Sequence, residues 1–189
     1  MPRLLTFSQG DMDMPRCSTP RLQGIVDSLM QVVAPKVGTA LDGLSYVLVE
    51  NCMALQGGNP AIYLNSLKVQ ERVVGWVNRA KIGVIDAVQG NSVAVNNGKM
   101  DDIPLLYGVL LHESAHAWAE KCGFANTEKN AYMFEIQWVC ALAAAPMHPL
   151  AADMRAGLAA YFQSRMPQFQ KEAGVVEHLR WTMQRHGFA

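Results

Sequence analysis

The stretch LLHESAHAWAE, Leu110 to Glu120, sets two histidines four residues apart, with a glutamate directly after the first. Residues four apart lie on one face of an α-helix, about one turn from each other, so His112 and His116 can direct their rings to one point. Apolar residues flank the motif on both sides and predict a partly buried helix. We interpret this stretch as a helix that carries a candidate metal site.

The residues around this helix predict a mainly helical α+β fold, with a small sheet upstream of the histidine helix. Asp101 or Asp102 can cap that helix, its first turn tolerates Pro104, and it should run to Cys122 before a Gly123 C-cap. Upstream, we expect strands over 44–50, 61–65 and 92–95, and helices over 22–35 and 66–80. Downstream, we expect helices over 127–145, 150–165 and 169–185.

Length and composition limit the classes of protein that fit. The 189 residues are 50% hydrophobic, which suits one domain over 1–189 with an irregular start over 1–20. Sixteen basic residues balance sixteen acidic ones, which argues against nucleic acid or an anionic membrane as partner. No secretory signal or membrane helix is predicted, so we expect a cytoplasmic protein, or one exported without a classical signal peptide. Composition leaves the oligomeric state open.

The four cysteines do not form a pattern typical of a metal site or a disulfide framework. Cys17, Cys52, Cys122 and Cys140 are widely spaced, with no C-x-x-C pair. Buried free thiols are the expected state. A bridge between Cys122 and Cys140, both in predicted helices, stays open.

The histidine motif has the composition of a catalytic zinc site. Imidazole suits Zn²⁺, and catalytic sites use three protein ligands with water in the fourth position. Glu113 is rotated by roughly 100° from His112 along the helix, so it can reach that water without binding the metal. The sequence therefore predicts His112 and His116 as zinc ligands and Glu113 as the catalytic base.

Three glutamates compete to be the third ligand. Glu120 lies one more turn along the same helix and is the weakest candidate. Two helices joined by a short connection pack antiparallel, which sets Glu135 opposite His116 and leaves Glu128 near the bend. Glu135 also lies among apolar residues, where a carboxylate needs a partner. We predict Glu135 as the ligand; an Arg or Lys partner for Glu135, and Glu128 as ligand, remain the alternatives.

The motif resembles that of zincin metallopeptidases, and His112-Glu113-x-x-His116 followed by eighteen residues and Glu135 is similar to the gluzincin spacing. The resemblance covers about 30 residues, and FEIQ stands where gluzincins usually have Asn-Glu before a small residue. A second resemblance is to deuterolysin-like aspzincins, whose acidic ligand follows the second histidine by about eleven residues and precedes a tyrosine. Glu128 and Tyr132 stand in about that place, without the Gly-Thr-x-Asp pattern.

The resemblance implies peptide-bond hydrolysis in a zincin-like metallopeptidase domain, with a peptide or protein as substrate. Zinc polarises the carbonyl and its water, and Glu113 takes the water's proton and passes it to the leaving amine. An edge strand, expected at Asn91–Val95, aligns the substrate by strand addition. A tyrosine or histidine often stabilises the oxyanion, and six residues are candidates: Tyr107, Tyr132, His148, Tyr161, His178 and His186.

The main hypothesis is a small zinc peptidase, either a housekeeping or regulatory protease or, by analogy of size, a secreted or injected bacterial effector or toxin. A different class is an inactive metal-binding scaffold or interaction domain. Glu113 favours catalysis over that alternative, because a purely structural site has no use for an unligated carboxylate beside the metal. A third class is a metal-free helical binding protein in which both histidines only pack.

Overall fold

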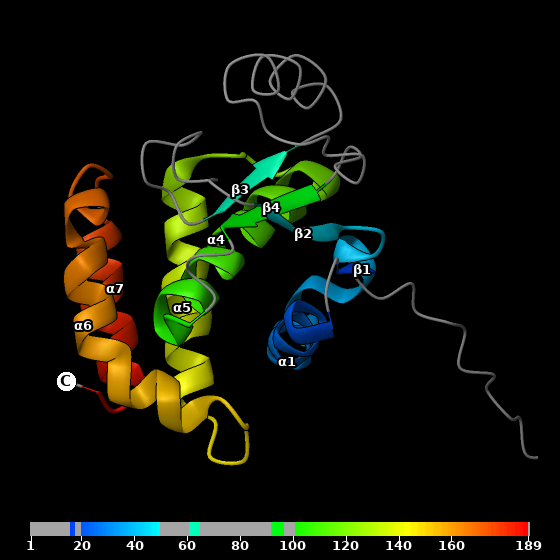
Figure 1. Ribbon diagram of the computed structural model, residues 1–189. Coiled ribbons are helices and arrows are strands. Elements are labelled where there is room, and N and C mark those ends of the chain that lie inside the picture. The colour runs from blue at the N-terminus through cyan, green and yellow to red at the C-terminus, as the bar shows by residue number, and fades with distance from the viewer. Residues whose placement is uncertain (1–15, 18–19, 50–60, 65–91, 97–100, 189) are drawn as a thin grey trace, which may run out of the picture.

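The computed structural model describes residues 16–17, 20–49, 61–64, 92–96 and 101–188. Five α-helices, a short 3₁₀ helix and a small sheet make up this part of the chain, and the sheet lies at one side of the helices (Figure 1). The helices are α1 (Pro20–Val37), α4 (Ile103–Cys122), α5 (Glu128–Ala144), α6 (Ala151–Phe169) and α7 (Val175–Arg185), and the 3₁₀ helix η1 is Gly38–Leu41. The predicted mainly helical α+β fold is confirmed.

The described sheet has four strands in the order β1-β2-β4-β3: β1 (Arg16–Cys17), β2 (Ser45–Val49), β4 (Ser92–Asn96) and β3 (Ala61–Leu64). β1 and β4 each pair parallel with β2, and β3 pairs antiparallel with β4. The three predicted strands are confirmed, but the edge is not where we expected it. β4 contains most of the predicted edge strand, yet it lies between β2 and β3, so β3 is the edge beside it.

α4 begins and ends where the sequence predicts. The Asp102 side chain accepts a hydrogen bond from the Leu105 amide at 3.4 Å, and Pro104 lies in the first turn, where a missing amide hydrogen costs nothing. Gly123 has φ +71°, a left-handed conformation that glycine adopts without strain. Thr127 caps α5 in the same manner by accepting from the Asn130 amide at 3.2 Å.

The other helices differ from prediction mainly at their ends. α1 runs through Pro35 to Val37, whose side chain is buried, and the helix stops at Gly38 with φ +55°. α6 likewise runs through Pro167 to Phe169, so α7 starts later than expected, at Val175. The predicted helix over 66–80 and most of the irregular start over 1–20 lie outside the described residues.

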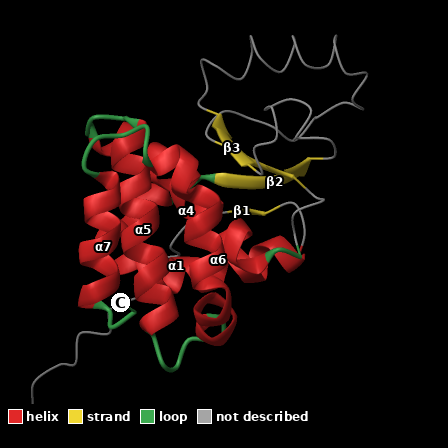
Figure 2. Cartoon of the chain, turned by 90° about the vertical axis from the view of Figure 1, so that its left-hand side faces the viewer, coloured by secondary structure: helices red, strands yellow, loops and turns green. Residues whose placement is uncertain are grey.

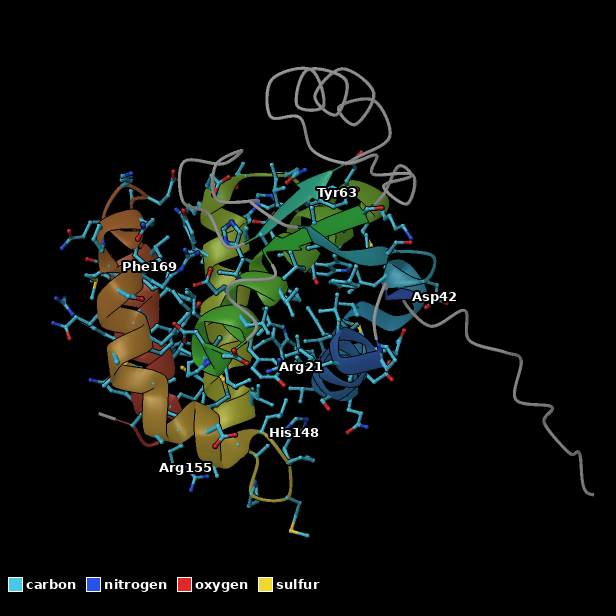
Figure 3. All side chains as sticks on the ribbon, in the orientation of Figure 1. Arg21, Asp42, Tyr63, His148, Arg155 and Phe169 are labelled. Carbon is cyan, nitrogen blue, oxygen red and sulfur yellow. The ribbon has the colours of Figure 1, made fainter. Side chains whose placement is uncertain are left out.

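α5 is the central helix, with α6 and α7 on one side of it and α4, α1 and the sheet on the other (Figures 1 and 2). Its side chains Ile136, Val139 and Leu142 are fully buried. α4 packs between α5 and the sheet, so the histidine motif lies at the junction of the two layers. The turn after α5 is fixed to α1 by His148, whose Nε2 donates to the Ser28 carbonyl at 2.9 Å (Figure 3).

Two cysteines of the described residues, Cys122 and Cys140, are free thiols. Cys122 and Cys140 form no bridge; Cys140 is buried as expected, but Cys122 is exposed. Cys52 is outside the described residues. In the part of the chain that the structure describes, no helix combines the length and the apolar character needed to cross a bilayer.

Candidate metal centre

The two histidines of α4 direct their rings to one point, as the spacing predicts. The Nε2 atoms of His112 and His116 are 3.2 Å apart, and both rings are largely buried. The helix is held in place by its neighbours: Leu110 and Leu111 are buried in the core, and the Ser114 hydroxyl lies 2.6 Å from that of Tyr46 on β2. The motif helix is therefore fixed against the sheet.

The carboxylate that meets both Nε2 atoms is Glu128, the first residue of α5. Its Oε2 lies 3.3 Å from His112 Nε2, and its Oε1 lies 3.6 Å from His116 Nε2. Its side chain is 56% exposed, so it closes the group from the solvent side. His112, His116 and Glu128 together form a group whose ligand atoms all lie within 4.8 Å of one another. These three residues are able to hold a metal ion.

Glu135, the ligand favoured from the sequence, is not in this group. Its Oε2 lies 3.0 Å from Nδ1 of His112, on the other side of the ring from the group. The reasoning from equal distances placed Glu128 near the bend and away from the histidines, whereas in the structure the α4–α5 connection turns back toward α4. Asn126 Oδ1 reaches His116 Nδ1 at 2.6 Å, and the Phe124 amide donates to the Ala119 carbonyl. Residues near the bend thus lie beside the histidines.

Glu135 has the arginine partner that the sequence reasoning held open. Arg165 on α6 donates to both carboxylate oxygens of Glu135, at 2.9 and 2.8 Å, and the Tyr161 hydroxyl donates to Oε1. The Glu135 side chain is fully buried. A Cβ on Gly108 of α4 would overlap the Tyr161 hydroxyl, so this glycine permits the close approach of α6. Arg165 and Gly108 had no signal in the sequence that tied them to the motif, and Tyr161 was a candidate only for the oxyanion, not as a partner of Glu135.

The hydrogen positions at the two rings follow from their outer neighbours. His116 Nδ1 lies 2.6 Å from the amide oxygen of Asn126, so its neutral tautomer carries the hydrogen on Nδ1. His112 Nδ1 lies 3.0 Å from the Glu135 carboxylate without hydrogen-bond geometry, and the negative charge there favours a hydrogen on the same nitrogen. Both Nε2 atoms then present lone pairs, 3.2 Å apart and close to the Glu128 carboxylate. Three acceptors in contact require a shared cation, either a proton or a metal ion.

The carboxylates around His112 also favour a positive charge at this position. Burial alone lowers the pKa of His112, but the carboxylates of Glu128 and Glu135 outweigh it and raise the value to about 9. His112 in turn is the main reason that the pKa of Glu128 is lowered to about 2. Burial acts to raise the pKa of Glu135, but His112 and Arg165 overcome this and lower it. The group is thus negative wherever His112 is neutral.

Glu113 lies beside the group without joining it. Its Oε2 accepts a hydrogen bond from the backbone amide of Tyr63 on β3 at 2.6 Å (Figure 3 labels Tyr63). Burial raises the pKa of Glu113, while the nearby His112 and His116 oppose the rise. The strand contact was not foreseen from the sequence, because it joins residues fifty positions apart. One carboxylate oxygen is thus held by the sheet edge and the other is left for a second partner.

The remaining candidates are scattered. Tyr132 is near the group, with its ring centroid 4.7 Å from that of His112, and it helps to lower the pKa of Glu128. Glu120 is exposed, and its charge adds to the effect of burial in raising the pKa of Tyr63. The other candidate residues are not in the group. Tyr107 is buried in the core, His148 is hydrogen-bonded to α1, and Tyr161 is hydrogen-bonded to Glu135. His178 and His186 lie in α7 and at its end.

Comparisons of this chain with known protein families, with characterised proteins and with solved structures give no match.

The donor set fits a zinc ion. In a tetrahedral centre with bonds of about 2.0–2.1 Å, neighbouring donor atoms lie roughly 3.3–3.4 Å apart. The three separations in the group are 3.2, 3.3 and 3.6 Å. Two imidazoles and one carboxylate leave a fourth position for water, which is the composition of a catalytic centre and not of a closed structural one. The outer contacts at both Nδ1 atoms match the second layer that such ligands need.

Proposed function

We propose that this chain is a zinc-dependent peptidase in which His112, His116 and Glu128 hold the metal and Glu113 is the general base. The observation that carries the proposal is the meeting of three ligand atoms beside a carboxylate that does not join them. A purely structural centre has no need of that fourth residue. The arrangement favours the deuterolysin-like resemblance over the gluzincin one, because Glu128 is the acidic member and Tyr132 follows it.

Bound zinc would supply a Lewis acid and a water of lowered pKa. The residues of this chain would do the rest. The Tyr63 amide holds one oxygen of Glu113, so the other oxygen is free to accept a proton from the attacking water. Burial raises the pKa of Glu113 toward the range in which a carboxylate both takes and returns a proton near neutral pH. Glu113 then passes that proton to the leaving amine.

Two further parts of the site suit a peptide substrate. β3 is the sheet edge next to Glu113, and an extended peptide bound along such an edge would bring a carbonyl to the metal. Tyr132, whose ring lies beside that of His112, is the candidate nearest the group to donate to the developing oxyanion. The proposed substrate is therefore a peptide or an exposed protein segment in extended conformation.

The test is metal content and cleavage of a quenched-fluorescence peptide library, measured on the same preparations. We expect one zinc per wild-type chain, loss of zinc in His116→Ala and Glu128→Gln, and retention in Glu113→Gln with cleavage reduced by about 10²–10⁴-fold. Glu177→Gln is the matched control for Glu128→Gln, because Glu177 also lies in the first turn of an exposed helix end. It should keep both zinc and activity.

Three outcomes would contradict the proposal in different ways. A wild-type chain without zinc removes the metal centre altogether and leaves two packing histidines. One zinc per chain with equal cleavage by wild type and Glu113→Gln removes the catalytic role and leaves a metal-binding scaffold. If Glu128→Gln keeps its zinc while Glu135→Gln loses it, Glu135 is the ligand and the side chains rearrange on metal binding.

A further inference from the structure

A cavity of about 660 Å³ opens beside the candidate metal centre, between α4, the α4–α5 connection, α5 and α7. Its volume lies in the range of roughly 300–1,000 Å³ that is typical of small-molecule sites. His116 and Asn126 are among its lining residues, whereas His112, Glu113 and Glu128 are not. A molecule in this cavity would therefore lie next to the metal centre without occupying it.

One wall of the cavity is a continuous row of aromatic rings. Trp118 contacts Phe124 at 5.1 Å and Phe134 at 5.5 Å between ring centroids, and Phe134 contacts Trp138 at 6.0 Å. Phe124 is 55% exposed although it is a large apolar side chain. Aromatic walls of this kind bind an apolar or aromatic group by burying its surface from water. The cavity can therefore bind the apolar part of a ligand against this wall.

The charged side chains that line the cavity are both cations among the residues that the structure describes. They are Lys36 and Arg185, and no described Asp or Glu lines it. Neither of the two forms an ion pair with a carboxylate among the residues that the structure describes. Lys36 Nζ lies 5.8 Å from the Trp118 ring centroid, so one positive charge stands directly at the aromatic wall. In a chain with no net charge, this concentration of one sign is local.

From these observations we propose that the cavity binds a small amphipathic carboxylate, with its apolar body against the aromatic row and its negative group toward Lys36 and Arg185. His178 also lines the cavity, and its Nε2 lies 3.4 Å from the Thr182 hydroxyl. This site is separate from the proposed peptidase centre and does not depend on a bound metal. It shares Asn126 with that centre, because Asn126 both lines the cavity and accepts from His116 Nδ1.

The experiment uses three probes with one apolar body: 4-phenylbutyrate, 4-phenylbutanol and 4-phenylbutylamine. Binding is measured by calorimetry and by tryptophan fluorescence in the presence of EDTA, so that zinc plays no part. We expect saturable binding of the carboxylate, about three- to tenfold tighter than the alcohol, because exposed ion pairs contribute modestly, and the weakest binding for the amine.

Two variants and one control locate the site. Lys36→Gln/Arg185→Gln should remove the preference for the carboxylate over the alcohol, and Gln137→Trp, which places a large ring in the lining, should weaken all three probes. Lys171→Gln/Arg180→Gln removes two exposed cations that do not line the cavity and should behave as wild type.

The proposal is overturned if none of the probes binds saturably, if the alcohol binds as tightly as the carboxylate, or if Gln137→Trp binds all three probes as wild type does. None of these results bears on the zinc content, so failure here is distinct from failure of the proposed peptidase.

Discussion

The two histidines of the candidate metal centre have opposite surroundings. On the His112 side, the outer partner is Glu135, which is fully buried and held by Arg165 and Tyr161 from α6. On the His116 side, the outer partner is Asn126, an exposed residue of the α4–α5 connection. One half of the site is thus built into the core, and the other half is built from a surface connection.

The difference has an energetic cause. A carboxylate without access to water must have its charge and lone pairs satisfied by the protein, so the partners of Glu135 are fixed once the helices pack. The exposed residues Asn126 and Glu128 can exchange their contacts with water at little cost. We infer that the His112 half is preorganised by folding and that the His116 half adjusts when a ligand arrives. Three predictions test this contrast.

The largest effect is expected from Arg165→Met in the buried half. The substitution keeps much of the side-chain volume but leaves the buried Glu135 carboxylate without its guanidinium partner, with His112 and Tyr161 as its remaining partners. We expect the free energy of unfolding to fall by about 3–5 kcal/mol, measured by urea denaturation of the metal-free protein. Glu128→Gln in the exposed half should change it by no more than about 1 kcal/mol.

A double variant separates lost charge pairing from lost packing. Arg165→Met/Glu135→Leu removes both partners, and replacing both members of a buried pair by apolar residues is often close to neutral. It should recover most of the stability lost in Arg165→Met. A double variant as unstable as the single one would mean that Arg165 stabilises the protein by packing on Tyr132 and Phe169 among others. The ion pair with Glu135 would then not be the main source of stability in the buried half.

A smaller effect is expected on metal affinity. Glu135→Gln keeps the size of the side chain but removes the charge behind His112, and we expect zinc affinity to fall about 10–100-fold. Asn126→Ala should cost less than this, because water can replace the amide oxygen at an exposed position. Competition with a chromophoric chelator measures both, with Gln163→Ala on the outer face of α6 as the control. Equal losses in Glu135→Gln and Asn126→Ala would remove the contrast between the two halves.

The same contrast explains what the sequence could and could not predict. Helix spacing predicted the meeting of His112 and His116, and local signals predicted the ends of α4, because both depend on neighbours within a few residues. The third member of the group depends on how the Gly123–Thr127 connection folds back, which no periodicity encodes. The sequence favoured Glu135 partly because it lies among apolar residues, where a carboxylate needs a partner. That reasoning did identify a buried carboxylate with a partner, but Glu135 is not in the group that His112, His116 and Glu128 form.

Contacts between distant elements were also beyond the sequence. Arg165 and Tyr63 reach the site from positions thirty residues after Glu135 and fifty before Glu113. The order of the strands in the sheet could not be predicted from the sequence for the same reason. The segment at 92–95 was predicted as a strand, but only the pairing of β4 with β2 and β3 makes it internal. Local pattern gives elements, and tertiary pairing decides which of them face the site.

The smallest effect is a pH dependence of the contact between His112 and Glu128, which joins the two halves. In metal-free protein, the pKa of His112 is raised from 6.5 to about 9, so its contribution to stability is complete below pH 6.5 and is lost as the pH rises through 9. The pKa of Glu128 is lowered from 4.5 to about 2, so its contribution is present above pH 4.5 and is lost as the pH falls through 2.

The difference in stability between wild type and Glu128→Gln should therefore be greatest between about pH 4.5 and 6.5 and should decline on both sides of that window. The magnitude is small, because the Glu128 side chain is more than half exposed and water screens the pair. Thermal unfolding of both proteins in EDTA across pH 3–10 measures it. A difference that stays constant over this range would mean that Glu128 does not interact with a protonated His112, and the exposed half would then have no electrostatic link to the buried one.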